Sequence, residues 1–296
     1  MEIVKNSKIN GILTIKEIPY DIAKKMMLEN HYSKKWNTSF GKINIGIFKE
    51  GRLLGACVFG NLMNPKSYKN IGDGESGSVI ELNRMWLDDE LGMNSETILI
   101  SSSFKIIKAL YPHIRYVQSF ADGRLGCGTV YKAASFRYFG YSESLFFKNI
   151  KTDEVFHKVP LENTKRPMGF LGKNRYYLDN NLEAFYVKTY KYIFQLYKKH
   201  PVKLKQEEYP LYDKGYNIVE YTHPIGLLCR LALMYHKIGD EEYFKKTLSH
   251  LKDVGYTSDN ISLERNNQKN NKSYIWFKSE YILNRKNVDK LLKMER

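Results

Sequence analysis

The order of the periodic segments between residues 12 and 140 limits most strongly what this chain can fold into. Two mainly apolar runs, 43–49 and 52–59, flank Glu50-Gly51. This pair indicates a two-residue β-hairpin, because glycine adopts the positive φ that a tight turn requires. The other elements expected here are a short strand at 12–15, a helix at 22–30, a strand at 79–87, a helix at 94–110, a strand at 116–120 and a short helix at 128–139 that ends at Gly140. This order predicts an α/β fold in which a mixed sheet is flanked by helices.

The character of the sequence changes near residue 179. The elements expected beyond it are a basic and aromatic segment at 185–199, helices at 224–238 and 240–254 joined by Gly239-Asp240, and a polar loop at 264–273 before a last helix. We therefore expect two domains. The first, at 1–178, would carry the chemistry, and the second, at 179–296, would be a smaller, mainly helical and basic accessory domain.

The chain has 47 Lys and Arg against 32 Asp and Glu, which gives a formal net charge of +15. The positive excess is spread over both expected domains, so it is not a basic tail. Such a charge favours a polyanionic partner and salt-sensitive association. A composition rich in Lys, Asn and Tyr can equally reflect an AT-rich genome.

The cysteine pattern favours a reducing compartment. Cys57, Cys127 and Cys229 are odd in number and far apart, so neither a disulfide framework nor a zinc knuckle is expected. No run approaches the roughly 20 apolar residues of a membrane span, and charges interrupt the start of the chain where a signal peptide needs apolar residues. We expect a cytoplasmic protein that does not enter a membrane.

The turn at 88–97 is the candidate binding site for a donor. It precedes an expected helix, whose free N–H groups and dipole can bind an anion. The element order resembles that of GNAT-type acetyltransferases, and this resemblance implies acetyl-CoA or another acyl-type donor at Asn94, Ser95, Glu96 and Thr97. The turn lacks the Arg-x-x-Gly-x-Gly pattern of that family, and its three preceding acidic residues would repel an anion.

Several motifs are specific only when they are taken together. They are His31-Tyr32-Ser33, Leu82-Asn83-Arg84-Met85-Trp86-Leu87, Asn94-Ser95-Glu96, Ser101-Ser102, Ser119-Phe120-Ala121-Asp122-Gly123, Gly126, and the run from Gly128 through Tyr131 to Gly140. The set resembles the Mom family of phage DNA-modification proteins over residues 20–178. The resemblance implies an acetyltransferase-like fold and conversion of adenine in phage DNA to an N6-carbamoylmethyl form that protects the DNA from restriction. It leaves the mechanism open, because simple acyl transfer would give an N6-amide, whereas this product joins N6 to a methylene carbon.

Carried over residue by residue, the resemblance places the catalytic residues at His31, Tyr32, Arg84, Ser119, Asp122 and Tyr131. Adenine N6 is a poor nucleophile, so a carboxylate such as Asp122 could accept its proton as the new bond forms. Arg84 could hold a phosphate or pair with Asp122, His31 could contact the base or transfer a proton, and Tyr131 could protonate a leaving group or fill the core. Typical members have a histidine near Gly126, which this chain lacks, and we expect no metal site from a single His and a single Asp.

The expected partner is double-stranded DNA. Adenine N6 is paired with thymine inside a duplex, so reaction at N6 requires base flipping. The candidate DNA-binding residues are Lys34, Lys35, Trp36, Lys198 and Lys199.

Two alternatives remain: an N-acyltransferase that acts on a small amine, a protein or RNA, and a non-catalytic DNA-binding protein that blocks restriction. Neither the oligomeric state nor the target sequence follows from the chain.

Overall fold

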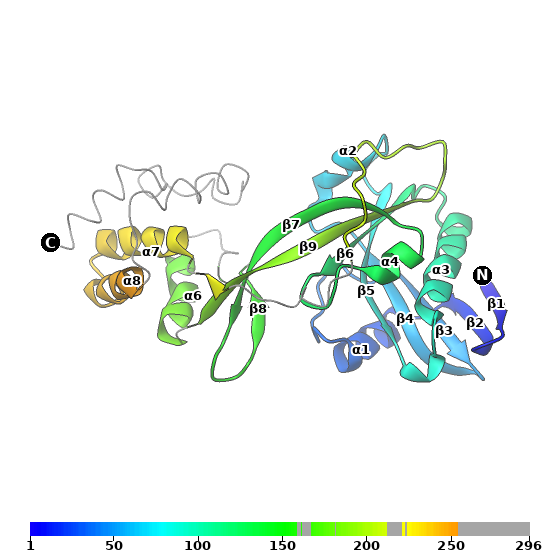
Figure 1. Ribbon diagram of the computed structural model, residues 1–296, viewed down its shortest axis with the longest axis horizontal. Helices are drawn as coiled ribbons and strands as arrows, with labels where there is room; N and C mark the ends of the chain where they lie inside the picture. Colours follow the sequence, from blue (N-terminus) through cyan, green and yellow to red (C-terminus); the bar gives the residue numbers. More distant parts are fainter. Residues whose placement is uncertain (159–160, 162–166, 181, 212–220, 223, 254–296) are drawn as a thin grey trace. The chain divides into compact units, whose positions relative to one another are not determined.

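The computed structural model describes residues 1–158, 161, 167–180, 182–211, 221–222 and 224–253 (Figure 1). The polar loop and last helix expected beyond residue 254 lie outside this part. The chain divides into two compact units, one of Met1–Ser142 with Lys188–Ile218 and the other of Glu143–Val187 with Val219–Arg296. Each unit is therefore built from separate stretches of sequence.

A mixed sheet forms the centre of the first unit. Its strands, in order across the sheet, are β1 (Glu2–Ser7), β2 (Gly11–Glu17), β3 (Ile43–Lys49), β4 (Arg52–Gly60), β5 (Val79–Leu87), β6 (Tyr116–Asp122), β9 (Glu183–Gln195) and β7 (Arg137–Lys148). From β1 to β5 each strand is antiparallel to the next. β6 is parallel to β5 and antiparallel to β9. The long helix α3 (Ser95–Leu110) joins the parallel pair, as a parallel connection requires. The predicted α/β class and mixed sheet are confirmed.

Alternating side chains of the central strands face opposite layers. On β4, Ala56 and Val58 pack in the same cluster as Ala23 and Met27 of α1 (Tyr20–Asn30). The side chains between and beyond them, including Cys57, instead join the cluster that contains the buried face of α3. Because strand side chains alternate with a period of two, α1 and α3 cover opposite faces of the sheet.

The predicted hairpin is confirmed between β3 and β4. Glu50 has φ 51° and Gly51 has φ 77°, and Lys49 pairs with Arg52 directly across the turn. Positive φ at both central residues is the backbone of the two-residue hairpin turns that match the twist of a sheet.

The prediction of a helix at 128–139 is mostly wrong. Helix α4 covers only Thr129–Ala133, and β7 begins at Arg137. Phe136 and Tyr138 are buried at alternate positions. This spacing belongs to a strand, and Gly140 lies within β7 instead of closing a helix.

The boundary expected after residue 178 differs from the observed division because β9 was not foreseen as a strand. Its seven residues from Thr189 to Gln195 pair with all seven residues of β6, so this part of the chain completes the sheet of the first unit. Short segments fill the remaining loops: two 3-10 turns, η1 (Pro65–Ser67) and η2 (Asp89–Leu91), and the single-turn helix α2 (Tyr68–Ile71).

The second unit has a helical core of its own. It combines the distal parts of β7 and β9 with β8 (Val155–His157), β10 (Tyr221–Thr222), α6 (Pro167–Asn180), α7 (Ile225–Ile238) and α8 (Glu241–Asp253). The predicted helical pair is confirmed as α7 and α8, joined at Gly239, whose φ of 74° ends α7. The phenol of Tyr235 on α7 donates to the carbonyl oxygen of Leu171 on α6 at 2.9 Å.

Cys57, Cys127 and Cys229 are buried thiols, and none of them forms a disulfide within the part of the chain that the structure describes. Among the helices that the structure describes, none is both long enough and apolar enough to cross a bilayer.

Candidate active site

The parallel strands β5 and β6 separate soon after they pair, and this separation opens the candidate site. They pair only over 79–81 and 116–118. Just beyond, the hydroxyl of Ser119 donates to the carbonyl oxygen of Leu82 at 3.1 Å. The next residues of the two strands face a cavity of about 350 Å³. This volume lies within the range of pockets that hold a small organic ligand, about 300–1,000 Å³.

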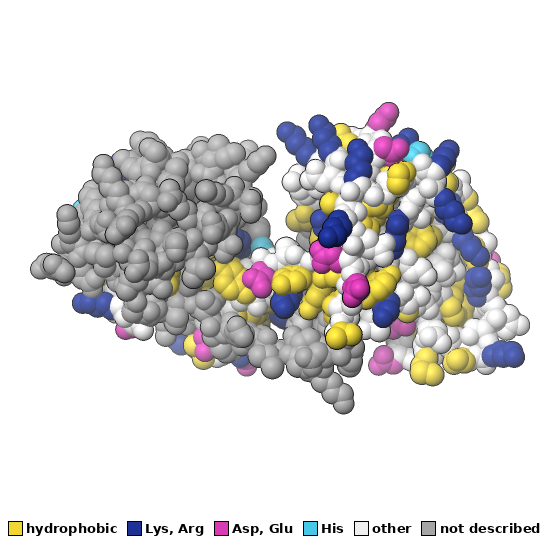
Figure 2. Space-filling view, turned by 45° about the horizontal axis from the view of Figure 1, so that its top comes forward, with side chains coloured by type: hydrophobic (Ala, Val, Ile, Leu, Met, Phe, Trp, Pro, Cys, Tyr) yellow, Lys and Arg dark blue, Asp and Glu magenta, His cyan; other side chains and the backbone are white. Residues whose placement is uncertain are grey.

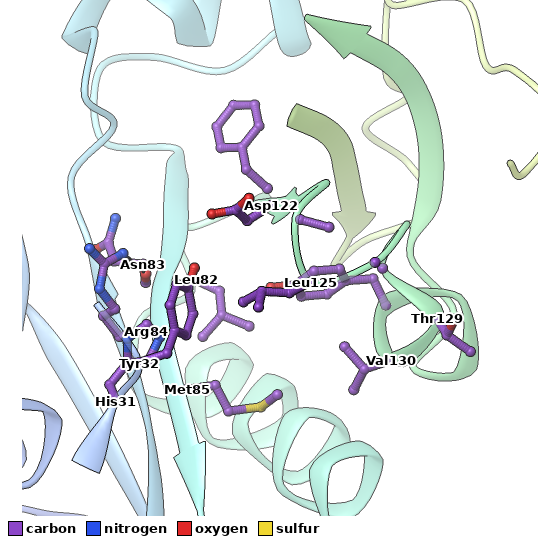
Figure 3. Close-up of a pocket in the computed structure, with 15 residues that line it drawn as sticks. His31, Tyr32, Leu82, Asn83, Arg84, Met85, Asp122, Leu125, Thr129 and Val130 are labelled. Carbon is purple, nitrogen blue, oxygen red and sulfur yellow. Dashed lines mark hydrogen bonds between the residues drawn. The ribbon is translucent and has the colours of Figure 1, made fainter. Parts of the chain in front are cut away.

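Four segments line the cavity (Figure 3): His31 and Tyr32 after α1, residues 82–85 of β5, residues 120–122 at the end of β6, and residues 125, 126 and 128–131 beyond it. The structure therefore brings together five of the six expected catalytic residues. The sixth, Ser119, is fully buried beside the cavity.

A β-bulge explains why four successive residues of β5 reach the cavity. Val58 of β4 pairs with Arg84, but Phe59 pairs with Leu82, so Asn83 has no partner on β4. An extra residue bends the strand and changes the direction of its side chains, as bulges beside active sites commonly do.

His31 is held in its neutral form at the end of α1. The ring is 6% exposed, and burial together with the nearby Arg84 lowers its pKa to about 4. The backbone N–H of Ser33 donates to Nδ1 at 3.1 Å, so the proton of the neutral ring lies on Nε2. The ring of Tyr32 packs on this ring at a tilt, with the centroids 4.2 Å apart and the planes 33° from parallel. The Tyr32 ring is itself 56% exposed at the cavity, and partial burial and Asp122 raise its pKa.

Asp122 ends β6 and forms an ion pair with Arg124. Its carboxylate accepts from the backbone N–H of Arg124 at 3.0 Å, from Nε at 3.0 and 3.1 Å, and from Nη2 at 2.5 Å. The pair is charge-assisted and nearly bidentate, which fixes the carboxylate and the turn that follows it. The partner of Asp122 is thus Arg124, and the Asp122–Arg84 pair considered from the sequence is not formed.

Arg84 has a donor without a partner. Its Nη1 donates to the carbonyl oxygen of Asn83 at 2.6 Å, and its guanidinium lies 4.7 Å from the centre of the Phe40 ring. Its buried Nε makes no hydrogen bond with the described residues. Burial lowers its pKa, so an anion or a carbonyl oxygen in the cavity would stabilise the charged form.

Tyr131 lines the cavity and also packs in the core. Its ring contacts Tyr192 and Phe136, with centroids 5.2 and 5.3 Å away. Burial raises its pKa to about 12, and the hydroxyl of Ser119 acts against this shift. The phenol is therefore protonated at neutral pH, and both roles considered from the sequence are compatible with its position.

A buried polar group next to the cavity was missed in the sequence. Glu81 accepts from Nδ2 of Asn83 at 2.9 Å and from Nε2 of Gln118 at 3.1 Å, and burial raises its pKa. This network fixes the side chain of the bulge residue. Polar residues at the alternate positions 81 and 83, in a strand whose remaining residues other than Arg84 are apolar, were the available signal.

The residues expected to bind a donor do not reach this cavity. Ser95 Oγ donates to the carbonyl oxygens of Leu91 and Gly92, and Thr97 Oγ1 donates to that of Asn94. Neither Asn94 nor Glu96 lines the cavity. With these hydroxyls engaged in their own turn and three acidic residues just before it, the residues present do not fit an acyl-CoA pyrophosphate by their side chains.

The expected DNA-binding residues fall into two places. Lys34 and Lys35 are exposed just after Tyr32, whereas Trp36 donates to the hydroxyl of Tyr20 at 2.8 Å and packs on neighbouring rings. Lys198 and Lys199 are exposed beyond Gln195, which pairs with the first residue of β6. At about 3.3 Å per residue, that end of β6 lies on the order of 20 Å from Asp122.

Metal ligands do not cluster in the part of the chain that the structure describes, where no three His, Cys, Asp or Glu side chains gather closely enough to hold an ion.

The family model and a curated relative point to the same family. The model of the Mom protein family matches residues 12–211. The methylcarbamoylase mom of Escherichia phage Mu is 34% identical over 209 residues, which cover 67% of this chain and 83% of that protein. Among solved structures, a probable acetyltransferase from Staphylococcus epidermidis (10% identity, TM-score 0.35) covers 62% of this chain and 98% of its own. A Bacillus subtilis acetyltransferase in complex with CoA (11% identity, TM-score 0.34) likewise covers 62% of this chain and 98% of its own.

Proposed function

Because the chain belongs to the Mom protein family, we propose that it is a transferase that modifies the N6 position of adenine in double-stranded DNA. The product is a carbamoylmethyl-like adenine that protects the DNA from restriction, in the cytoplasm of an infected or lysogenic bacterium. One observation carries this proposal: the split between β5 and β6 gathers a carboxylate, a protonated phenol, a neutral imidazole and an arginine around one cavity.

The chemistry of N6 assigns a task to Asp122. As the bond forms between N6 and a carbon atom of the donor, N6 must lose one proton, and removal of this proton raises the electron density on a nitrogen whose lone pair is delocalised into the ring. The Asp122 carboxylate is held by Arg124 at the cavity and can take this proton.

The remaining residues hold the reactants and supply a proton. Tyr131 is protonated and can give its proton to the departing group of the donor, whose bond to carbon breaks as the N6 bond forms. The free Nε–H of Arg84 can hold a carbonyl or phosphate oxygen of the donor. The exposed face of Tyr32 offers a surface on which the flipped adenine stacks. The donor is left unspecified: the side chains of residues 94–97 do not fit an acyl-CoA pyrophosphate, and transfer of an acyl group alone would give an N6-amide instead of the carbamoylmethyl product.

Nucleoside analysis tests the proposal directly. DNA from cells that express the protein is digested and examined by mass spectrometry for modified deoxyadenosine. We expect a modified nucleoside that is absent from cells with the empty vector. Unmodified DNA with tight, salt-dependent binding would support the passive anti-restriction protein instead, and unmodified DNA with a modified amine, protein or RNA would support the N-acyltransferase.

A further inference from the structure

Leu125 stands out at the rim of the cavity because it is a large apolar side chain left in solvent. It is 57% exposed, yet it lines the cavity together with the catalytic residues. Figure 3 shows Tyr32 and Leu125 on facing sides of the cavity. A single exposed leucine needs no explanation by itself. Leu125 differs from other exposed leucines in two ways: it lies at the entrance of the candidate site, and hydrogen bonds anchor the loop that carries it.

The loop that carries Leu125 is anchored at both ends. At its start, the backbone N–H of Gly123 donates to the carbonyl oxygen of Lys188 at 2.8 Å, and that of Leu125 donates to the carbonyl oxygen of Asp122 at 2.9 Å. At its end, the phenol of Tyr192 donates to the carbonyl oxygen of Cys127. The backbone therefore holds the leucine in a fixed place, although more than half of its side chain is exposed to solvent.

The charges around this loop suit a phosphate backbone. The exposed Lys188 lies beside the start of the loop, with its ammonium 4.8 Å from the centre of the Tyr141 ring, whereas the charge of Arg124, directly before Leu125 in sequence, is already paired with Asp122. The exposed Lys34 and Lys35 follow Tyr32 on the facing side. Proteins that insert an apolar side chain between stacked bases commonly surround it with basic side chains that hold the neighbouring phosphates. Leu125 and the lysines around it have this arrangement.

We propose that Leu125 is the wedge that enters the DNA duplex and fills the space left by the flipped adenine. Flipping removes a base from its stack at a cost of a few kcal/mol, and an apolar side chain in the gap restores part of the lost contact. The base itself then lies against Tyr32, across the cavity from Leu125. This inference rests on the proposed function, since it requires an adenine that leaves a duplex.

The first test measures modification in cells. Without the leucine side chain, flipping of the adenine should be less favourable by a few kcal/mol, which corresponds to at least about a tenfold drop in the flipped population. Leu125→Ala should therefore lower the modified deoxyadenosine in cellular DNA by about tenfold. Leu125→Met keeps the apolar volume and should retain most of the modification. The matched control is Leu110→Ala, an exposed leucine at the end of α3 that is 42% exposed, which should change nothing.

The second test needs no donor. 2-Aminopurine replaces adenine in a duplex, and its fluorescence rises when it leaves the stack. Wild-type protein should raise this signal and Leu125→Ala should not, whereas both should bind the single-stranded oligonucleotide equally. An equal fluorescence rise with both proteins would overturn the proposed role of Leu125. So would a variant that loses duplex binding and single-strand binding to the same extent. Absence of modified adenine with the wild type would instead overturn the proposed function, and the fluorescence would still decide the role of Leu125.

Discussion

At the scale of single residues, Asp122 is the group whose chemistry is most open to test. Asp122→Asn keeps an oxygen that can accept from Arg124 but removes the ability to take a proton. We expect modification to fall at least about 100-fold, the lower range of general base catalysis, with thermal unfolding nearly unchanged. Asp153→Asn, at an exposed ion pair with Lys148, is the control. Wild-type amounts of modified adenine with Asp122→Asn would show that another group accepts the proton.

His31 gives a prediction about pH and stability. Its pKa is about 4 in the folded protein, against about 6.5 in an unfolded chain. Between these values the unfolded chain binds a proton that the folded protein excludes, so stability should fall as the pH is lowered from about 6.5 to about 4. Urea unfolding across this range should show a shallower pH dependence for His31→Asn than for wild type or for the exposed-residue control His113→Asn. Parallel curves for all three proteins would mean that His31 titrates normally.

At the scale of elements, β9 decides whether the sequence-derived domain at 1–178 can fold alone. A chain that ends at Asn180 lacks the strand that pairs with β6 along its full length and lacks Tyr192, which is buried against Tyr131. We expect this truncated chain to lose cooperative thermal unfolding, measured by circular dichroism, while the full chain retains it. A cooperative transition in the truncated chain would show that β9 is dispensable and that the sequence-derived boundary is physically meaningful.

At the scale of the whole molecule, the distance between the cavity and Lys198 and Lys199 matters. These lysines lie on the order of 20 Å from Asp122 along β6, which corresponds to about six base pairs of DNA. If they contact phosphates, replacing both with alanine should reduce the log–log salt slope of DNA binding by about one for each lost contact. The reduction should appear with duplexes long enough to reach them and vanish with shorter ones. Lys8→Ala, in the turn between β1 and β2, is the control, and an unchanged slope with long duplexes would remove both lysines from the DNA surface.

The sequence by itself determined the elements whose signals are local. The hairpin at Glu50-Gly51 follows from turn chemistry, α3 follows from apolar periodicity, and the helical pair at Gly239 follows from a glycine stop between two amphipathic runs. The identity of most cavity residues followed from the family resemblance, which needs no coordinates.

Only the tertiary structure decided features that depend on pairing between distant segments. The basic and aromatic run at 185–199 carries no local signal that separates a helix from a strand. It forms a strand because it pairs with β6, and this pairing places the boundary between the units elsewhere than expected. The bulge at Asn83 exists only relative to β4, and the partner of Asp122 is fixed by the turn after β6. Long-range pairing of this kind is decided by the free energy of the whole sheet, which no single segment of the sequence records.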